Sequence, residues 1–85
     1  MQIIKYAGKS CVKCKILDKV FSYIKDLPCE VETVYVEDVG EHEFVTKGID
    51  MLPTLAIING DSEIRLTGAI TPAKVQEAIE KVQNV

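Results

Sequence analysis

Apolar and polar residues alternate in two different patterns over the first third of the chain. Residues 2–6 form a short, largely apolar run, which predicts a strand. After a turn at residues 7–10, apolar side chains recur every three or four residues, the spacing of an amphipathic helix with lysines on its outer face. We expect Ser10 to be the N-cap of this helix and Pro28 to end it. The predicted apolar face consists of Val12, Ile16, Leu17, Val20, Ile24 and Leu27.

The middle of the chain predicts a second strand, a short helix and a third strand. Residues 31–36 are rich in β-branched side chains, which favour extended structure. Residues 41–47 fit a short helix that ends at Gly48, because glycine readily adopts the left-handed conformation found after helices. Residues 54–58 are mostly apolar and predict the third strand.

The last third of the chain predicts a β-hairpin followed by a helix. Asn59-Gly60 is typical of a two-residue turn, so residues 63–67 are expected to return antiparallel to the preceding strand. Thr71 is the expected N-cap of the last helix, with Pro72 at the first position, where proline is favoured. The expected buried stripe of this helix is Val75, Ala78, Ile79 and Val82.

The order of these elements predicts an α/β fold. Two strands joined by a helix are expected to pair in parallel through a right-handed crossover, whereas the final hairpin is antiparallel. The prediction is therefore a three-layer arrangement, with a central mixed four-stranded sheet and helices on both faces. The 85 residues are enough for one small core, so we expect a single domain over residues 1–85.

Composition and charge narrow the possible functions. Hydrophobic residues make up 47% of the chain and charged residues 27%, values typical of a globular protein. The net charge of −3 argues against nucleic acid as the main partner, and no apolar run is long enough to span a membrane. The first residues do not resemble a signal peptide, so we expect a cytoplasmic protein. An odd count of 3 cysteines fits a disulfide-stabilised secreted scaffold poorly.

Cys11 and Cys14 carry the strongest chemical signal in the sequence. Two thiols separated by two residues can form a small disulfide, and here they begin the first predicted helix. Unpaired N–H groups and the positive end of the helix dipole favour a thiolate at that position, and a thiolate is the nucleophile of disulfide exchange. The alternative is half of a zinc site, but its other ligands would have to be Cys29 and His42, which lack metal-ligand spacing. The pattern therefore favours redox chemistry and no metal site.

Three stretches of the chain together resemble the thioredoxin-fold family. The first is the strand followed by Cys11-x-x-Cys14, the second is residues 48–55, and the third is residues 68–71. The resemblance covers nearly the whole chain, which looks like a compact core without the extra N-terminal strand and helix of full-size thioredoxins. In size the chain is similar to glutaredoxins, whereas its later motifs are more similar to thioredoxins.

The resemblance implies a thiol-disulfide oxidoreductase that acts on protein disulfides by dithiol–disulfide exchange. Cys11 would be the attacking thiolate and Cys14 the resolving thiol. A cis Pro53 would expose the backbone of Leu52, with which an extended substrate pairs as a strand. No bound cofactor is expected, because the Cys11–Cys14 disulfide is itself the redox-active group. The protein is expected to be a monomer whose partners are disulfide-containing proteins and, as electron donor, a flavoprotein of the thioredoxin-reductase type.

The chain also departs from the family at several positions. Lys5 stands where thioredoxins have a buried aspartate that transfers protons, and Val12-Lys13 replaces the usual Gly-Pro. Lys5 has two interpretations: its side chain extends to the sheet edge, which we favour, or it lies below Cys14 and accepts its proton. Lys5 and Lys13 are the candidate modulators of the thiol pKa.

Two alternative functions remain open on the sequence alone. One is a glutaredoxin-like oxidoreductase that depends on glutathione, although the tyrosine and the pair of acidic residues typical of glutaredoxins are absent. The other is a non-catalytic adaptor or metal-binding protein with the same fold.

Overall fold

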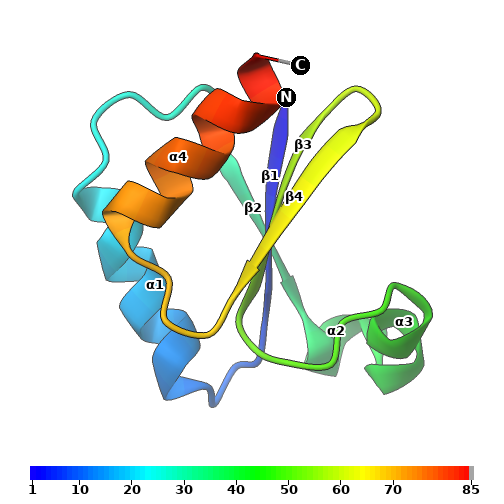
Figure 1. Cartoon of the computed structure of the whole chain (residues 1–85). Helices are drawn as coiled ribbons and strands as arrows, with labels where there is room; N and C mark the ends of the chain where they lie inside the picture. Colours follow the sequence, from blue (N-terminus) through cyan, green and yellow to red (C-terminus); the bar gives the residue numbers. More distant parts are fainter. Residues whose placement is uncertain (85) are drawn as a thin grey trace.

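The central element of the structure is a four-stranded sheet with the strand order β2-β1-β3-β4 (Figure 1). The computed structural model describes residues 1–84, and Val85, the last residue of the predicted domain, lies outside the described residues. Each strand agrees with its predicted range to within one residue at either end. The strands are β1 (Gln2–Ala7), β2 (Val31–Tyr35), β3 (Thr54–Asn59) and β4 (Ser62–Thr67).

The sheet is mixed, as the sequence predicts. β1 pairs in parallel with β2, so that Ile3 lies opposite Val31. β1 pairs antiparallel with β3 on its other side, where Ile3 lies opposite Ile57, and β3 pairs antiparallel with β4. β1 is therefore an inner strand, and the loop that leaves its C-terminal end leads directly to the two cysteines.

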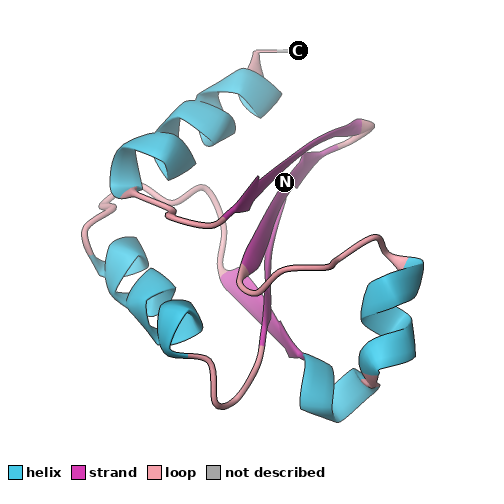
Figure 2. Cartoon of the chain, turned by 60° about the horizontal axis from the view of Figure 1, so that its bottom comes forward, coloured by secondary structure: helices cyan, strands magenta, loops and turns pink. Residues whose placement is uncertain are grey.

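Helices lie on both sides of the sheet, so the predicted three-layer α/β fold is confirmed. Figure 2 shows the first and last helices on one side and two short helices on the other. The sequence pattern does not predict the first of the short helices, which follows β2 without a break. No helix in residues 1–84 is long and apolar enough to cross a membrane. The helices are α1 (Val12–Ser22), α2 (Val36–Val39), α3 (Glu41–Thr46) and α4 (Pro72–Gln83).

α1 is shorter than its apolar pattern predicts, because it ends at Ser22 and not near Pro28. The Ser22 hydroxyl donates to the Lys19 carbonyl oxygen at 2.5 Å, and the Tyr23 and Ile24 N–H groups donate to carbonyls only three residues back. These short-range hydrogen bonds tighten the last turn and end the helix. Ile24 is nevertheless buried, so the apolar spacing correctly predicts the burial of this residue although the residue lies after the end of the helix.

The buried face of α1 is also narrower than predicted. Cys14, Leu17 and Val20 are buried, whereas Val12 and Ile16 are exposed. Side chains spaced three residues apart lie on one face of a helix, and Val12 and Ile16 lie outside that face. They form an apolar surface on the outer side of the helix, close to the cysteines.

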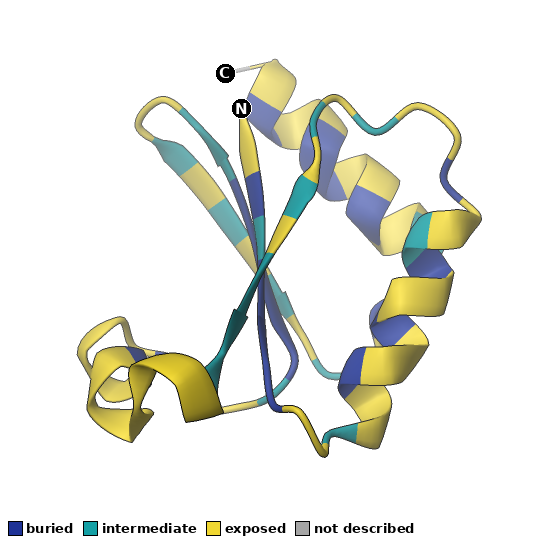
Figure 3. Ribbon diagram, turned by 180° about the vertical axis from the view of Figure 1, so that it is seen from behind, coloured by how far each residue is buried: buried dark blue, intermediate teal, exposed yellow. Residues whose placement is uncertain are grey.

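The larger hydrophobic core lies between the sheet and the two long helices. Figure 3 shows buried residues along both α1 and α4. The Thr71 hydroxyl accepts a hydrogen bond from the Lys74 N–H at 3.2 Å, which confirms Thr71 as the N-cap of α4. The predicted stripe of α4 is buried in this core together with residues from the strands and α1. The residues of this core include Ile3, Leu17, Leu55, Ile57, Val75, Ala78, Ile79 and Val82.

A smaller core fills the opposite face of the sheet. Tyr6 of β1 and Phe44 of α3 meet edge to face, with ring centroids 5.5 Å apart. Ile49 and Ala56 are buried in the same cluster. Aromatic pairs in this geometry add favourable energy beyond the area they bury. This cluster attaches α3 to the face of the sheet opposite α1.

The hairpin between β3 and β4 turns one residue later than predicted. Asn59 pairs with Ser62 in the sheet, so the turn residues are Gly60 and Asp61, and Gly60 has a positive φ of 63°. The Asn59 side chain donates a hydrogen bond from Nδ2 to the Val82 carbonyl oxygen at 2.9 Å. Asn59 is therefore the last residue of β3, and its side chain connects the end of this strand to α4.

Candidate active site

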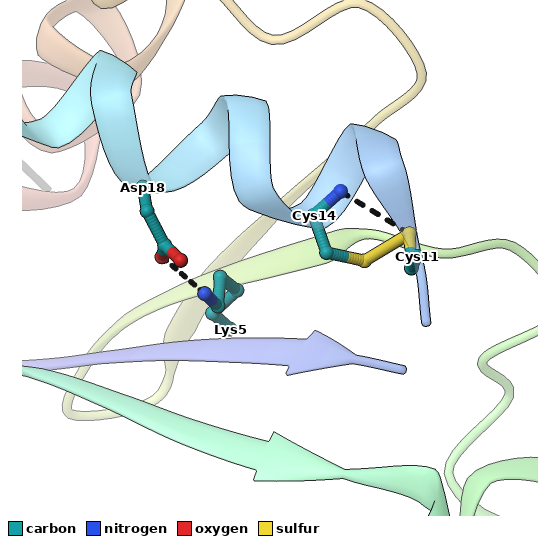
Figure 4. Close-up of polar contacts among 4 residues, drawn as sticks. All are labelled: Lys5, Cys11, Cys14 and Asp18. Atoms are coloured by element: carbon teal, nitrogen blue, oxygen red, sulfur yellow. Dashed lines mark hydrogen bonds and ion pairs between the residues drawn. A yellow bond between two sulfur atoms is a disulfide. The ribbon is translucent and has the colours of Figure 1, made fainter. Parts of the chain in front are cut away.

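The two cysteines lie at the N-terminal end of α1 and are joined by a disulfide bond (Figure 4). Cys11, and not Ser10 as predicted, is the N-cap residue, and its Sγ accepts a hydrogen bond from the Cys14 N–H at 3.1 Å. The first N–H groups of a helix have no partner within it, so they stabilise negative charge on this sulfur once the disulfide is reduced. Cys11 is partly exposed, whereas Cys14 is only 3% exposed. Cys11 is therefore the more accessible residue of the pair.

The loop before Cys11 is attached to α2. The Cys11 N–H donates to the Gly8 carbonyl oxygen at 3.2 Å, and the Lys9 N–H donates to both carboxylate oxygens of Glu37 at 3.0 and 3.2 Å. The Lys9 ammonium donates to Asp38 at 2.8 Å. This hydrogen bond and the charge of Asp38 raise the pKa of Lys9 above its usual 10.5, so Lys9 is cationic at neutral pH. The sequence signal for this anchor was only a pair of acidic residues after a strand.

The loop that contains Pro53 lies next to the cysteines. The Leu52–Pro53 peptide bond is cis and Pro53 is buried. Gly8 brings the two loops together: a Cβ atom at Gly8 would lie 3.3 Å from Leu52 Cδ1 and 3.6 Å from Cys11 Cβ. The Leu52 side chain and the more accessible cysteine thus lie on either side of Gly8, at the place where a substrate strand is expected.

An apolar cleft of about 290 Å³ lies beside the disulfide. It runs between α1, the Pro53 loop and the turn between β4 and α4, so it joins all three stretches that carry the sequence resemblance. Val12 is 69%, Ile16 54% and Met51 51% exposed, which adds apolar surface around the cysteines. The cleft is lined by Lys13, Ile16, Leu17, Pro53, Gly68, Ala69, Ile70 and Thr71.

Lys5 is buried below α1, and the expectation that its side chain extends to the sheet edge is wrong. β1 has a neighbouring strand on each side, so a side chain on its α1 face has no short route to the edge. Lys5 instead forms an ion pair with Asp18 of α1. Lys5, Asp18 and Cys14 line one small cavity of about 110 Å³. Asp18 was not predicted as part of the site, because it has the polar spacing of an ordinary exposed helix residue.

The remaining candidate residues named from the sequence lie at the rim of this site or away from it. Lys13 is exposed and lines the apolar cleft. Cys29 packs against the larger core, and His42 is exposed on α3. Within residues 1–84, no three His, Cys, Asp or Glu side chains gather in a group able to bind a metal ion.

Comparison with known proteins identifies the fold. No protein-family model matches the sequence, and no curated protein matches it. Solved structures do match over nearly the whole chain. Thioredoxin 1 from the thermophilic eubacterium Thermosipho africanus TCF52B is similar with a TM-score of 0.76 and 22% sequence identity, covering 99% of this chain and 96% of that one.

Two further thioredoxins give similar results. A thioredoxin from Fasciola hepatica matches with a TM-score of 0.70 and 26% identity, covering 94% of this chain and 78% of its own. A mutant thioredoxin from Halobacterium salinarum NRC-1 matches with a TM-score of 0.78 and 16% identity, covering 98% of this chain and 74% of its own. The chain therefore has the thioredoxin fold.

Fold and site together define the class: a small thioredoxin-fold protein with a disulfide-bonded CxxC pair at the start of a helix. Oxidoreductase chemistry in general is consistent with this combination. The particular activity of this chain depends on its own residues around the pair.

Proposed function

We propose that the protein is a thiol-disulfide oxidoreductase that reduces disulfides in protein substrates. The observation that carries this proposal is the asymmetry of the cysteine pair. Cys11 is partly exposed at the helix N-terminus, while Cys14 is buried behind it and bonded to it. One sulfur is accessible to a substrate, and the other is accessible mainly to the first sulfur.

The reaction begins with the reduced protein. The Cys11 thiolate attacks one sulfur of the substrate disulfide, and the other substrate sulfur leaves with the electron pair of the broken bond. Cys14 then attacks Cys11 Sγ in the mixed disulfide, which releases the second substrate thiolate and forms the Cys11–Cys14 disulfide. The helix N-terminus favours the Cys11 thiolate, and the cationic Lys9 and Lys13 add positive charge nearby.

The substrate is proposed to bind as an extended segment along the Leu52 backbone, with apolar side chains in the neighbouring cleft. The cleft beside Pro53 and the exposed Val12, Ile16 and Met51 support this part of the proposal. Backbone hydrogen bonds recognise any sequence, and apolar contacts select for exposed hydrophobic side chains next to the substrate disulfide. No bound cofactor takes part, because the cysteine pair carries both electrons.

We further propose a cytoplasmic monomer that receives its electrons from a flavoprotein of the thioredoxin-reductase type. The apolar surface around the cysteines supports a protein as electron donor, because a protein can cover it. Glutathione is the alternative donor. Comparing turnover with such a reductase and with glutathione distinguishes the two.

The test is an equilibrium titration in glutathione redox buffers, with the Cys11–Cys14 disulfide measured by alkylation and mass. A Cys29→Ser background removes the third thiol. We expect a reversible two-electron transition, and a midpoint near roughly −270 mV is typical of a cytosolic reductase. The controls Cys11→Ser and Cys14→Ser should abolish the intramolecular disulfide. No reversible intramolecular disulfide in the parent protein would reject the proposal and favour the adaptor or metal-binding alternative, which a zinc or copper titration then tests.

A further inference from the structure

The segment that leads to Pro53 borders a second cavity, on the face of the sheet opposite α1. This cavity has a volume of about 280 Å³ and lies between α2, α3 and residues 49–52, and we term it the α3 groove. Two of its lining residues, Phe44 and Ile49, are buried members of the smaller core. Its other lining residues are Val36, Glu41, Val45, Asp50, Met51 and Leu52.

The α3 groove presents apolar surface to solvent. Val45 is 71% exposed and Met51 is 51% exposed, and both lie beside the buried side chains of the smaller core. Exposed apolar side chains around a concave apolar surface are typical of a place where another molecule binds. The groove is therefore able to bury an apolar side chain of a partner.

Two carboxylates at the groove are available to a partner. Glu41 and Asp50 are exposed, and no ion pair within residues 1–84 involves either of them. The neighbouring carboxylates differ in this respect, because Asp38 pairs with Lys9 and Glu43 pairs with Lys47. A cationic group bound at the groove would thus meet two carboxylates that have no competing cation.

Charge is distributed unevenly on the two sides of the disulfide. Residues 36–52 contain five acidic side chains and one lysine, whereas residues 9–25 contain five lysines and one aspartate. Figure 1 shows α1 on one side and α2 with α3 on the other, with the loop that leads to the cysteines between them. A partner that lies across the disulfide therefore meets negative charge on the α3 side and positive charge on the α1 side.

We propose that the α3 groove binds a segment of the protein substrate in which an apolar side chain stands next to a lysine or arginine. The inference rests on the proposed function and names the class of substrate. The apolar side chain enters the groove, and the cationic group pairs with Glu41 and Asp50. Met51 and Leu52 continue the groove into the segment along which the substrate is proposed to extend. The lysines of α1 repel the same cationic group, so the charges also fix the orientation of the substrate.

The test measures which peptides form a mixed disulfide with Cys11. The full chain with Cys14→Ser and Cys29→Ser retains one thiol, which is first joined to glutathione as a mixed disulfide. A peptide with a single cysteine then exchanges with it: the peptide sulfur bonds to Cys11 Sγ, and glutathione leaves as the thiol. The equilibrium constant of this exchange is determined by mass spectrometry.

Two sets of peptides differ at one residue. In the first set, a leucine–lysine pair stands about two to five residues from the cysteine on either side, which spans roughly 7–17 Å of extended chain. In the second set, a leucine–glutamate pair takes its place. The ratio of the two equilibrium constants at each position is the charge preference, and comparing this ratio between variants cancels the intrinsic reactivity of the peptide thiols.

We expect the lysine peptide to be preferred by about three- to tenfold at one or more positions at low salt, the effect of two exposed charge pairs. The preference should nearly disappear at about 1 M salt, where the Debye length is about 3 Å. Glu41→Gln combined with Asp50→Asn should reduce it to less than about twofold.

The matched control is Asp61→Asn combined with Glu80→Gln. It removes the same charge from two exposed carboxylates, one in the β3–β4 turn and one on α4, and it should retain the preference of the parent. Val45→Ser tests the apolar half of the proposal. It should weaken the exchange of both peptide sets by about threefold and leave their ratio unchanged, because it removes apolar contact and no charge.

Three results would overturn the inference. The first is the absence of a charge preference at every peptide position. The second is a preference that persists at about 1 M salt or in the Glu41→Gln, Asp50→Asn variant. The third is unchanged peptide exchange in that variant together with slower reduction by the flavoprotein, which would assign the groove to the electron donor. If no peptide of either set forms a mixed disulfide with Cys11, the proposed function itself is contradicted.

Discussion

Glu37→Ala is the most direct test of how the loop before the cysteines is positioned. Both carboxylate oxygens of Glu37 accept from the single Lys9 N–H, at 3.0 and 3.2 Å, and no other described hydrogen bond joins α2 to this loop backbone. A charge-assisted hydrogen bond contributes about 1.5–3 kcal/mol when shielded from water, and Glu37 is exposed, so we expect a loss of about 1 kcal/mol in the free energy of unfolding. For a domain of this size, about 1 kcal/mol corresponds to a fall of about 4–8 °C in Tm.

The assay is thermal unfolding followed by circular dichroism, on oxidised and on reduced protein. Two variants serve as controls. Glu37→Gln retains one oxygen acceptor and should lose roughly half as much free energy as Glu37→Ala. Asp38→Asn removes only the exposed contact to the Lys9 ammonium and should lose least. An Asp38→Asn variant that is destabilised as much as Glu37→Ala, or a Glu37→Ala variant with unchanged Tm, would refute the argument that the backbone contact positions the loop.

Three further predictions test other parts of the structure. Ile16→Ser removes an exposed apolar side chain from the cleft, so KM for a protein disulfide should rise several-fold while Tm stays unchanged. A change in kcat alone would contradict the proposed substrate cleft. Val75→Ala creates a cavity in the larger core at a fully buried position, so urea denaturation should show a free energy of unfolding lower by about 2 kcal/mol. A loss below about 0.5 kcal/mol would mean that the core relaxes around the cavity. The pKa of Lys9 is raised in the folded state, so its pair with Asp38 stabilises the protein fully below pH 10.5 and loses this effect as the pH rises through the raised pKa. The Tm difference between the parent and Asp38→Asn should therefore vanish in strongly alkaline solution. A Tm difference that persists there would have another origin.

The fold was predictable from the sequence because its elements have strong local signals. The β-branched run before α2, the capped last helix and the apolar stripe of that helix each depend on neighbouring residues only. The parallel pairing of β1 and β2 followed from the helix between them, whereas the antiparallel pairing of β1 with β3 was not predicted. What the pattern misjudged was where elements end. Ile24 is buried without being helical, and Asn59 pairs with Ser62 as the last residue of its strand instead of forming the turn.

The candidate site was predictable in the same uneven way. Cys11, Cys14 and Pro53 stand in a short motif or beside one, so their positions were visible in the sequence. Lys5 was misjudged because its partner, Asp18, is on another element. A lysine in a strand normally extends to water, and only the packing of α1 across β1 provides a carboxylate close enough to keep it inside. Contacts between distant elements are decided by packing, which single-residue preferences do not contain.

The origin of the site in three separate stretches of the chain has a further consequence. The thiols are three residues apart, so they stay close in any state of the chain. The cleft beside them requires α1, the Pro53 loop and the turn before α4 together, and these meet only through the folded sheet. The closeness of the two thiols is therefore a local property, whereas the cleft is a property of the whole fold. As denaturant unfolds the protein, the disulfide exchange that we propose should therefore outlast, with small disulfides, the proposed selection among protein substrates.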